Sequence, residues 1–194
     1  MAPRTYRMER RAEGAEETRQ RIVQATMALH TRQGVLATSH KDIASLADVS
    51  VGTVYHHFPT VDSIVRACGA HVRELLPVPG PDAVNSRDPL RRRIESLAGA
   101  VVALYARMPW LEKLRTERHA VPALDMGISM REEAIRQLIR RALGRSPSAK
   151  KVRIVESILD TSVVNHLLEF GMDQKEAAST LASIINTWLE GGHS

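Results

Sequence analysis

The chain has 194 residues, of which 43% are apolar and 25% charged, a composition typical of a folded soluble protein rather than a disordered one. Its formal net charge of +5 favours an anionic partner. No apolar run reaches the roughly 20 residues that a membrane helix needs, and no secretory signal precedes the first helix. The single cysteine, Cys68, excludes an internal disulfide and a cysteine-based zinc site. We therefore expect a cytoplasmic protein.

The first residues of the chain are basic. Residues 1–11 carry four arginines against one glutamate, and their little apolar content predicts a flexible arm over residues 1–14. Two interpretations stay open: a solvated loose end, or an arm that contacts an anionic partner. The arginines concerned are Arg4, Arg7, Arg10 and Arg11.

Apolar residues recur with helical periodicity along almost the whole chain, and no segment alternates long enough to predict a strand. The pattern predicts an all-α fold of nine helices. The first runs from about Ala15 to Gln33 and ends at Gly34. The fourth is capped by Thr60 and runs to about Leu76.

Two short helices lie between these, joined by a tight turn. Ser39 and Asp42 have the spacing of a capping box at the start of the second helix. Asp48 stands in the turn, where a residue that tolerates positive φ is needed. Ser50 caps the third helix, which runs through Phe58. These proportions are those of a helix-turn-helix.

The proline-rich stretch Pro77–Pro81 separates this N-terminal part from the rest. Further helices are expected to begin at Asp88-Pro89, Pro109, Pro122, Ser146-Pro147 and Asp173, the last with a capping box to Glu176, and the final three to end at Gly144, Gly171 and Gly191. We predict a helix-turn-helix domain over residues 15–60 and a second, larger helical domain over residues 61–194.

The start of the third helix has the composition of a recognition helix. Val54 and Phe58, four residues apart, are expected to face the core, which leaves the N-terminal edge of the helix exposed. Small residues, hydroxyl groups and free N–H groups at that edge suit the phosphate oxygens that border a major groove, where a recognition helix enters. The alternative is a helical hairpin with solvent-facing histidines. The edge comprises Ser50, Val51, Gly52, Thr53, Tyr55, His56 and His57.

Residues 38–65, TSHKDIASLADVSVGTVYHHFPTVDSIV, resemble the DNA-binding signature of the tetracycline-repressor (TetR) family, and the resemblance extends back over the first helix. The resemblance implies a ligand-responsive transcriptional regulator, most plainly a repressor, that binds a palindromic double-stranded DNA operator as a homodimer and is released by a small apolar effector. It implies DNA contacts from the edge residues above and from Thr38, Ser39, His40 and Lys41.

The sequence departs from the family pattern at three positions. Val51 and Val61 stand where lysines are frequent, and Asp48 replaces the usual glycine of the turn. Loss of the two lysines removes phosphate contacts, so the arginines of residues 1–11 become candidates for a minor-groove contact.

The resemblance implies that the C-terminal two-thirds of the chain bind the effector and form the dimer. The stripes from Pro147 to Phe170 and from Gln174 to Leu189 suit a four-helix bundle between two subunits, although both could pack inside one chain. An apolar pocket could be lined by Leu97, Val101, Leu104, Tyr105, Met108, Trp110, Leu114, Met126 and Met130, with His166 as a polar group, although ordinary core packing explains the same residues.

Two other functions compete with that of a DNA-binding regulator. The chain has no phosphate loop, nucleophile elbow, HExxH or CxxC motif, which argues against an enzyme, and we assign no cofactor and no metal. Glu132 and Glu133 lie on a helix that also carries Arg136, Arg140 and Arg141, so surface ion pairs along the helix explain them. The second rival is a helical interaction or metal-sensing protein whose helix-turn-helix no longer binds DNA, and His71, His119 and His166 alone do not define a metal site.

Overall fold

The computed structural model describes residues 4–191, except for the side chains of residues 4–7 and 9. The described residues are helical and contain no strand, which confirms the all-α class. The helices are α1 (Arg4–Gln33), α2 (His40–Ala47), α3 (Val51–His57), α4 (Val61–Leu75), α5 (Leu90–Tyr105), α6 (Leu111–Glu117), α7 (Pro122–Leu143), α8 (Ala149–Ile158), α9 (Thr161–Glu169) and α10 (Gln174–Glu190), with short 3-10 turns at Pro81–Ala83 and Arg118–Ala120.

The chain folds into two compact units. The first contains the residues up to Leu75 together with Lys113–Gly127, and the second contains Leu76–Glu112 and the residues from Ile128 onward. A short segment from the second half of the sequence, comprising most of α6 and the start of α7, therefore belongs to the N-terminal unit.

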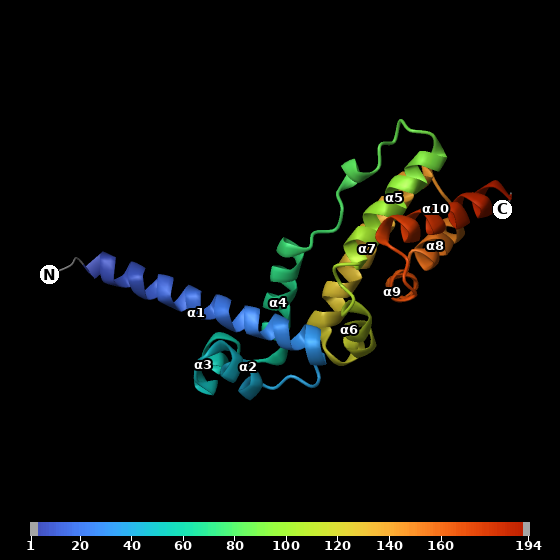
Figure 1. Cartoon of the computed structure of the whole chain (residues 1–194). Coiled ribbons are helices and arrows are strands. Elements are labelled where there is room, and N and C mark those ends of the chain that lie inside the picture. Colours follow the sequence, from blue (N-terminus) through green and yellow to red (C-terminus); the bar gives the residue numbers. More distant parts are fainter. Residues whose placement is uncertain (1–3, 192–194) are drawn as a thin grey trace. The chain divides into compact units, whose positions relative to one another are not determined.

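In the first unit, α2 packs against both α1 and α3, and α4 packs against α1 (Figure 1). One apolar cluster joins the four helices. Its fully buried members include Ile22 of α1, Ile43 of α2, Val54 of α3 and Ile64 of α4. Each helix contributes one apolar face to this core, as the helical spacing of its apolar residues predicts.

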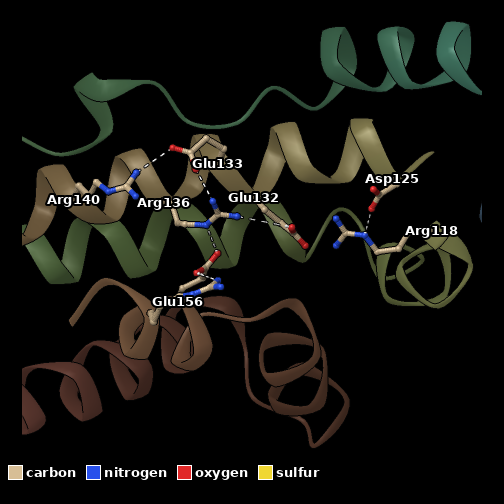
Figure 2. A network of polar contacts seen from close by, with 8 residues as sticks. Arg118, Asp125, Glu132, Glu133, Arg136, Arg140 and Glu156 are labelled. Carbon is tan, nitrogen blue, oxygen red and sulfur yellow. Dashed lines mark hydrogen bonds and ion pairs between the residues drawn. The ribbon is translucent and has the colours of Figure 1, made fainter. Parts of the chain in front are cut away.

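In the second unit, α5 packs along α10, and α9 contacts both (Figure 1). Ion pairs join α7 to α8 on the outside of this unit. Figure 2 shows Arg136 between Glu133 of its own helix and Glu156 of α8, whose Oε1 lies 2.7 Å from the Arg136 Nε. Arg140 pairs with Glu133 at 3.0 Å. The predicted surface pairing of these carboxylates is confirmed, with Glu156 as an additional partner.

Several predicted boundaries were wrong. α1 begins at Arg4 rather than near Ala15, so residues 4–14 continue the first helix. The predicted helix from Ser146 to Phe170 is two helices, because the Asp160 carboxylate accepts a bond from Ser162 N and caps a new helix.

Helix starts also differ from the predictions in the second unit. Pro89, not Asp88, is the N-cap of α5, without a side-chain cap. Ser148 caps α8, and the preceding Ser146 has φ of 47°. α6 starts at Leu111 rather than at Pro109. A proline marks the neighbourhood of a helix start, while the exact residue depends on which side chain reaches the free N–H groups.

Candidate nucleic-acid interface

Local hydrogen bonds fix the start of α2 and the turn after it. The Ser39 hydroxyl oxygen accepts from Asp42 N, and the Asp42 carboxylate accepts from Ser39 N at 3.0 Å, which is the predicted capping box. The Ser39 hydroxyl also donates to the Asp42 carboxylate at 2.6 Å, and this bond, together with the one from Ser39 N, holds the pKa of Asp42 below its usual range. Asp48 ends the helix with φ 52° and ψ 56°, the left-handed conformation expected of the turn.

Ser50 fixes the start of α3 in the same way. Its hydroxyl oxygen accepts from Thr53 N at 3.0 Å and lies 2.8 Å from the Thr53 hydroxyl. Val54 and Phe58 are buried, as predicted, and anchor the opposite face of the helix in the core. The N-terminal edge of α3 is consequently held firmly while it faces solvent.

The predicted contact residues on α3 form one surface. Tyr55 is 51% exposed and Val51 39% exposed. Ser50, Gly52 and His56 are exposed, and Thr53 and His57 are half-buried. A Cβ added at Gly52 would meet only the Ser50 hydroxyl, at 3.6 Å, so the backbone there is open to a close approach.

The contact residues predicted at the start of α2 adjoin this surface. Ser39 and Lys41 are exposed, and Thr38 is half-buried with its hydroxyl donating to Gly34 O. The half-buried His40 stacks its ring on that of Tyr55. The structure thus places the predicted contact residues of α2 next to those of α3.

Positive charge on this surface comes from few groups. Lys41 is exposed. Partial burial, with His56 and Arg19 nearby, lowers the pKa of His57, so at neutral pH His57 is mainly uncharged. Arg10 and Arg11 lie exposed on α1, whereas the side chains of Arg4 and Arg7 are outside the described part of the structure.

Two features of this unit were not anticipated from the sequence. The Arg19 guanidinium of α1 lies over the ring of Phe58, 5.3 Å from its centre. The Glu117 carboxylate contacts the turn between α1 and α2, although the two are 82 residues apart. The second contact has no local sequence signal, since it joins segments distant in the chain.

The residues predicted to line a ligand pocket do not share one environment. Met126 and Met130 are exposed, Trp110 is half-buried, and His166 is exposed with Nδ1 2.7 Å from Ser162 O. Leu114 and Met126 belong to the first unit and the others to the second. The remaining members are buried: Leu97, Val101, Leu104, Tyr105, Met108 and Leu114.

A groove of about 560 Å³ lies between α5 and α10 of the second unit. Its lining mixes polar and apolar surface and includes Arg91, Ser179, Ser183 and Asn186, and it contains none of the residues predicted to bind a ligand. The predicted ligand-binding set therefore stays a prediction.

Within residues 4–191 we find no group of three or more histidine, cysteine or acidic side chains placed to hold a metal ion. Burial raises the pKa of the Cys68 thiol to about 12, which removes it as a thiolate ligand or nucleophile near neutral pH. Among the same residues, no helix has the length and apolar content to span a bilayer.

Comparison with known proteins agrees with this geometry. Residues 22–68 match the family described as bacterial regulatory proteins, tetR family. They comprise the end of α1, all of α2 and α3, and half of α4, so the match covers the helix-turn-helix and the helices that support it.

Similarity to individual proteins extends further. The HTH-type transcriptional repressor KstR of Mycobacterium tuberculosis is 28% identical over 160 residues, which cover 80% of this chain and 72% of KstR. A tetR-family transcriptional regulator from Streptomyces coelicolor has the same fold, with a TM-score of 0.69, 20% identity, and coverage of 91% of this chain and 82% of that one.

The multidrug binding protein EbrR, crystallised with malachite green, has a TM-score of 0.60 at 19% identity, with 87% of this chain and 96% of that chain covered. The capped, outward-facing α3, the matched signature and the shared fold lead to one conclusion. Residues 22–68 match the DNA-binding region of the tetR family, and the chain around them is a DNA-binding transcriptional regulator that is similar to TetR-family proteins over most of its length.

Proposed function

We propose that the protein is a ligand-responsive repressor that acts in the cytoplasm, binding a palindromic operator as a homodimer and leaving it when a small apolar effector binds. The observation that carries the proposal is the N-terminal edge of α3. It is braced by the Ser50 cap and by the buried Val54 and Phe58, yet its polar and small residues face solvent. This arrangement suits insertion into a major groove.

A homodimer through the last two predicted helical stripes is supported by apolar side chains left exposed on α9 and α10. Phe170, which follows α9, is 85% exposed, and Val163 and Ile184 are also exposed. α9 and α10 contact each other, so these side chains come from adjacent elements. Large apolar groups on adjacent helices of one chain are suited to burial against a second copy.

The effector in this proposal is a small apolar molecule. The predicted pocket residues are mostly apolar, which favours an apolar ligand, and EbrR, which has the same fold, was crystallised with the organic dye malachite green. KstR is a repressor. Ligand and operator would each stabilise a different arrangement of the dimer, so each weakens binding of the other. In this proposal residues 15–60 bind DNA and residues 61–194 bind the effector and dimerise.

The arginines of residues 1–11 supply a further DNA contact in this proposal. α1 continues through Arg10 and Arg11, which are exposed. Since Lys41 is the one lysine of the predicted contact set, added arginines would supply counterion release that the helix-turn-helix lacks. Deletion of residues 1–11 should weaken DNA binding and flatten the plot of log affinity against log salt. An unchanged slope would refute this contact.

The proposal is tested by selecting DNA from a random duplex library with the purified protein, then titrating the selected duplex by fluorescence anisotropy. We expect an inverted repeat, a 2:1 protein-to-duplex complex in sedimentation, and release by at least one member of a panel of small apolar compounds. Selection of no sequence over the library background would favour the interaction or metal-sensing alternative, and a monomer on DNA would refute the dimer.

A further inference from the structure

The turn that joins α1 to α2 is held by a carboxylate from the other half of the sequence. Glu117 Oε2 accepts a hydrogen bond from Val35 N at 2.6 Å and lies 3.3 Å from Leu36 N, which also donates to it. Without Glu117, these two backbone N–H groups just after the end of α1 would need water as their hydrogen-bond partner. An ionised acceptor makes the bond to each of them stronger than a neutral one would.

The surroundings of this carboxylate are shaped to receive it. Gly34 has φ of 91°, a conformation that favours glycine, and a Cβ at that position would displace the Glu117 carboxylate from its present place. Val35 is buried. The nearby His30 is buried too, and burial lowers its pKa to about 4, an effect that the negative charge of Glu117 opposes. The carboxylate therefore acts within the packed end of α1.

The turn held by Glu117 leads directly into the DNA-binding helices. Thr38 N donates to Val35 O at 3.1 Å, and the Thr38 hydroxyl donates to Gly34 O at 2.7 Å. The next residue, Ser39, is the N-cap of α2. A short bonded path thus runs from Glu117 to the first turn of α2, where His40 stacks on Tyr55 of α3.

A second carboxylate holds the other end of the same segment. Asp62, in the first turn of α4, accepts from Ala123 N at the start of α7 at 2.7 Å. Within the same segment, Arg118 and Asp125 form an ion pair at 2.6 Å (Figure 2). Residues 113–127 are therefore fastened to the α1–α2 turn by Glu117 and to α4 by Asp62.

We propose that Glu117 is a positioning residue for DNA binding: through Val35 N and Leu36 N it sets the place at which α2 begins, and it transmits displacement of residues 113–127 to the helix-turn-helix. The first role, positioning of α2, rests on the proposed DNA binding by this protein. The second depends on the proposed effector response, because the segment continues at both ends into the second unit. If the Glu117 carboxylate moves by the length of one hydrogen bond, its bonds to Val35 N and Leu36 N are both broken.

The test uses the full chain with Glu117→Ala and Glu117→Gln, and with Glu112→Gln as a matched control on the same helix. Affinity for the duplex selected by the wild-type protein is measured together with exchange of individual backbone amides and the melting temperature. We expect Glu117→Ala to lower affinity about tenfold or more, with Glu117→Gln intermediate because its amide oxygen still accepts one bond. Glu112→Gln should resemble wild type.

The amides of Val35 and Leu36 should exchange faster in Glu117→Ala, while those of the buried core residues Ile22 and Val54 keep their protection. Faster exchange at Val35 with unchanged DNA affinity would overturn the positioning role. Loss of protection throughout the unit would show a general stabilising role instead and would also overturn it. If the wild type selects no DNA, the proposed function fails, whereas protected Val35 and Leu36 amides would still show that the contact exists.

For the transmission step, the compound that releases wild-type protein from DNA in the effector panel is titrated into Glu117→Gln bound to the same duplex. A ratio of DNA affinities without and with compound that is at least about fivefold smaller than in wild type supports transmission through Glu117. An equal ratio in both proteins overturns it, even where the variant binds DNA more weakly overall.

Discussion

The imidazole ring of His40 lies flat against the phenol ring of Tyr55, with ring centroids 4.3 Å apart and planes 5° from parallel. The two residues belong to α2 and α3, so the stack joins the helices at the surface proposed to meet DNA. The Nε2 atom of His40 is buried and has no hydrogen-bond partner among the described residues. Ring contact, rather than a polar bond at Nε2, accordingly holds His40 beside Tyr55.

This stack predicts that His40 and Tyr55 act on DNA as a pair. In a double-mutant cycle, the binding free energy lost in His40→Ala/Tyr55→Ala should differ from the sum of the two single losses. We expect a difference of about 0.5–1.5 kcal/mol, the usual contribution of an aromatic pair. His56, whose ring packs against His57 instead, provides the control cycle with Tyr55. Additive losses for His40 and Tyr55 in the anisotropy titration would show that the stack does not orient Tyr55 for binding.

Lysine can be introduced at the two positions where the family frequently has it. Val51 and Val61 are 39% and 43% exposed, so a lysine at either has room to reach solvent or phosphate. Val51→Lys and Val61→Lys should each raise affinity and make the slope of log affinity against log salt steeper by about 0.9 per phosphate contacted.

Leu90→Lys on α5 adds the same charge at a position of similar exposure, 38%, in the second unit. Its salt slope should stay at the wild-type value. Equal changes in all three variants would attribute the gain to net charge alone and would argue against phosphate contacts at α3 and at the start of α4.

Burial of His30 predicts a loss of stability in mild acid. Its pKa is about 4 in the folded protein against 6.5 in an exposed side chain, so the unfolded chain binds the proton first as the pH falls. Stability from the neutral ring is complete above pH 6.5 and decreases as the pH falls toward 4, by about 2 kcal/mol between pH 7 and pH 5.

Urea unfolding across this pH range measures the effect. His30→Met should flatten the decrease, whereas His119→Gln, at an exposed position, should leave it intact. A decrease of the same size in His30→Met would mean that other groups, such as His57, account for the acid sensitivity.

The sequence predicted best those features that depend on neighbouring residues. The capping boxes at Ser39 and at Asp173 and the left-handed Asp48 follow from spacings of a few residues, and the structure confirms them. The exposed edge of α3 followed in the same way from the four-residue spacing of Val54 and Phe58.

Features that depend on distant residues were not predicted. The apolar stripe continues past Asp160, so periodicity alone joined α8 to α9, although Asp160 has the residue type of a cap. The docking of Glu117 on Val35 joins residues far apart in the chain. Whether buried residues such as Leu97 line a pocket or fill a core is likewise decided by packing in three dimensions, which the sequence pattern does not encode.

Close approach of the N-terminal edge of α3 to DNA is tested most directly by Gly52→Ala. The added methyl group meets only Ser50 Oγ at 3.6 Å, an ordinary contact, so the variant should keep or raise the melting temperature. Gly99→Ala, where an added Cβ has no neighbour within 4 Å, is the matched control on α5.

We predict that Gly52→Ala lowers affinity for the selected duplex about tenfold or more, since a methyl group at a close interface separates contacts on both sides, while Gly99→Ala binds as wild type does. Wild-type affinity in a folded Gly52→Ala would contradict the claim that this edge of α3 enters the DNA groove.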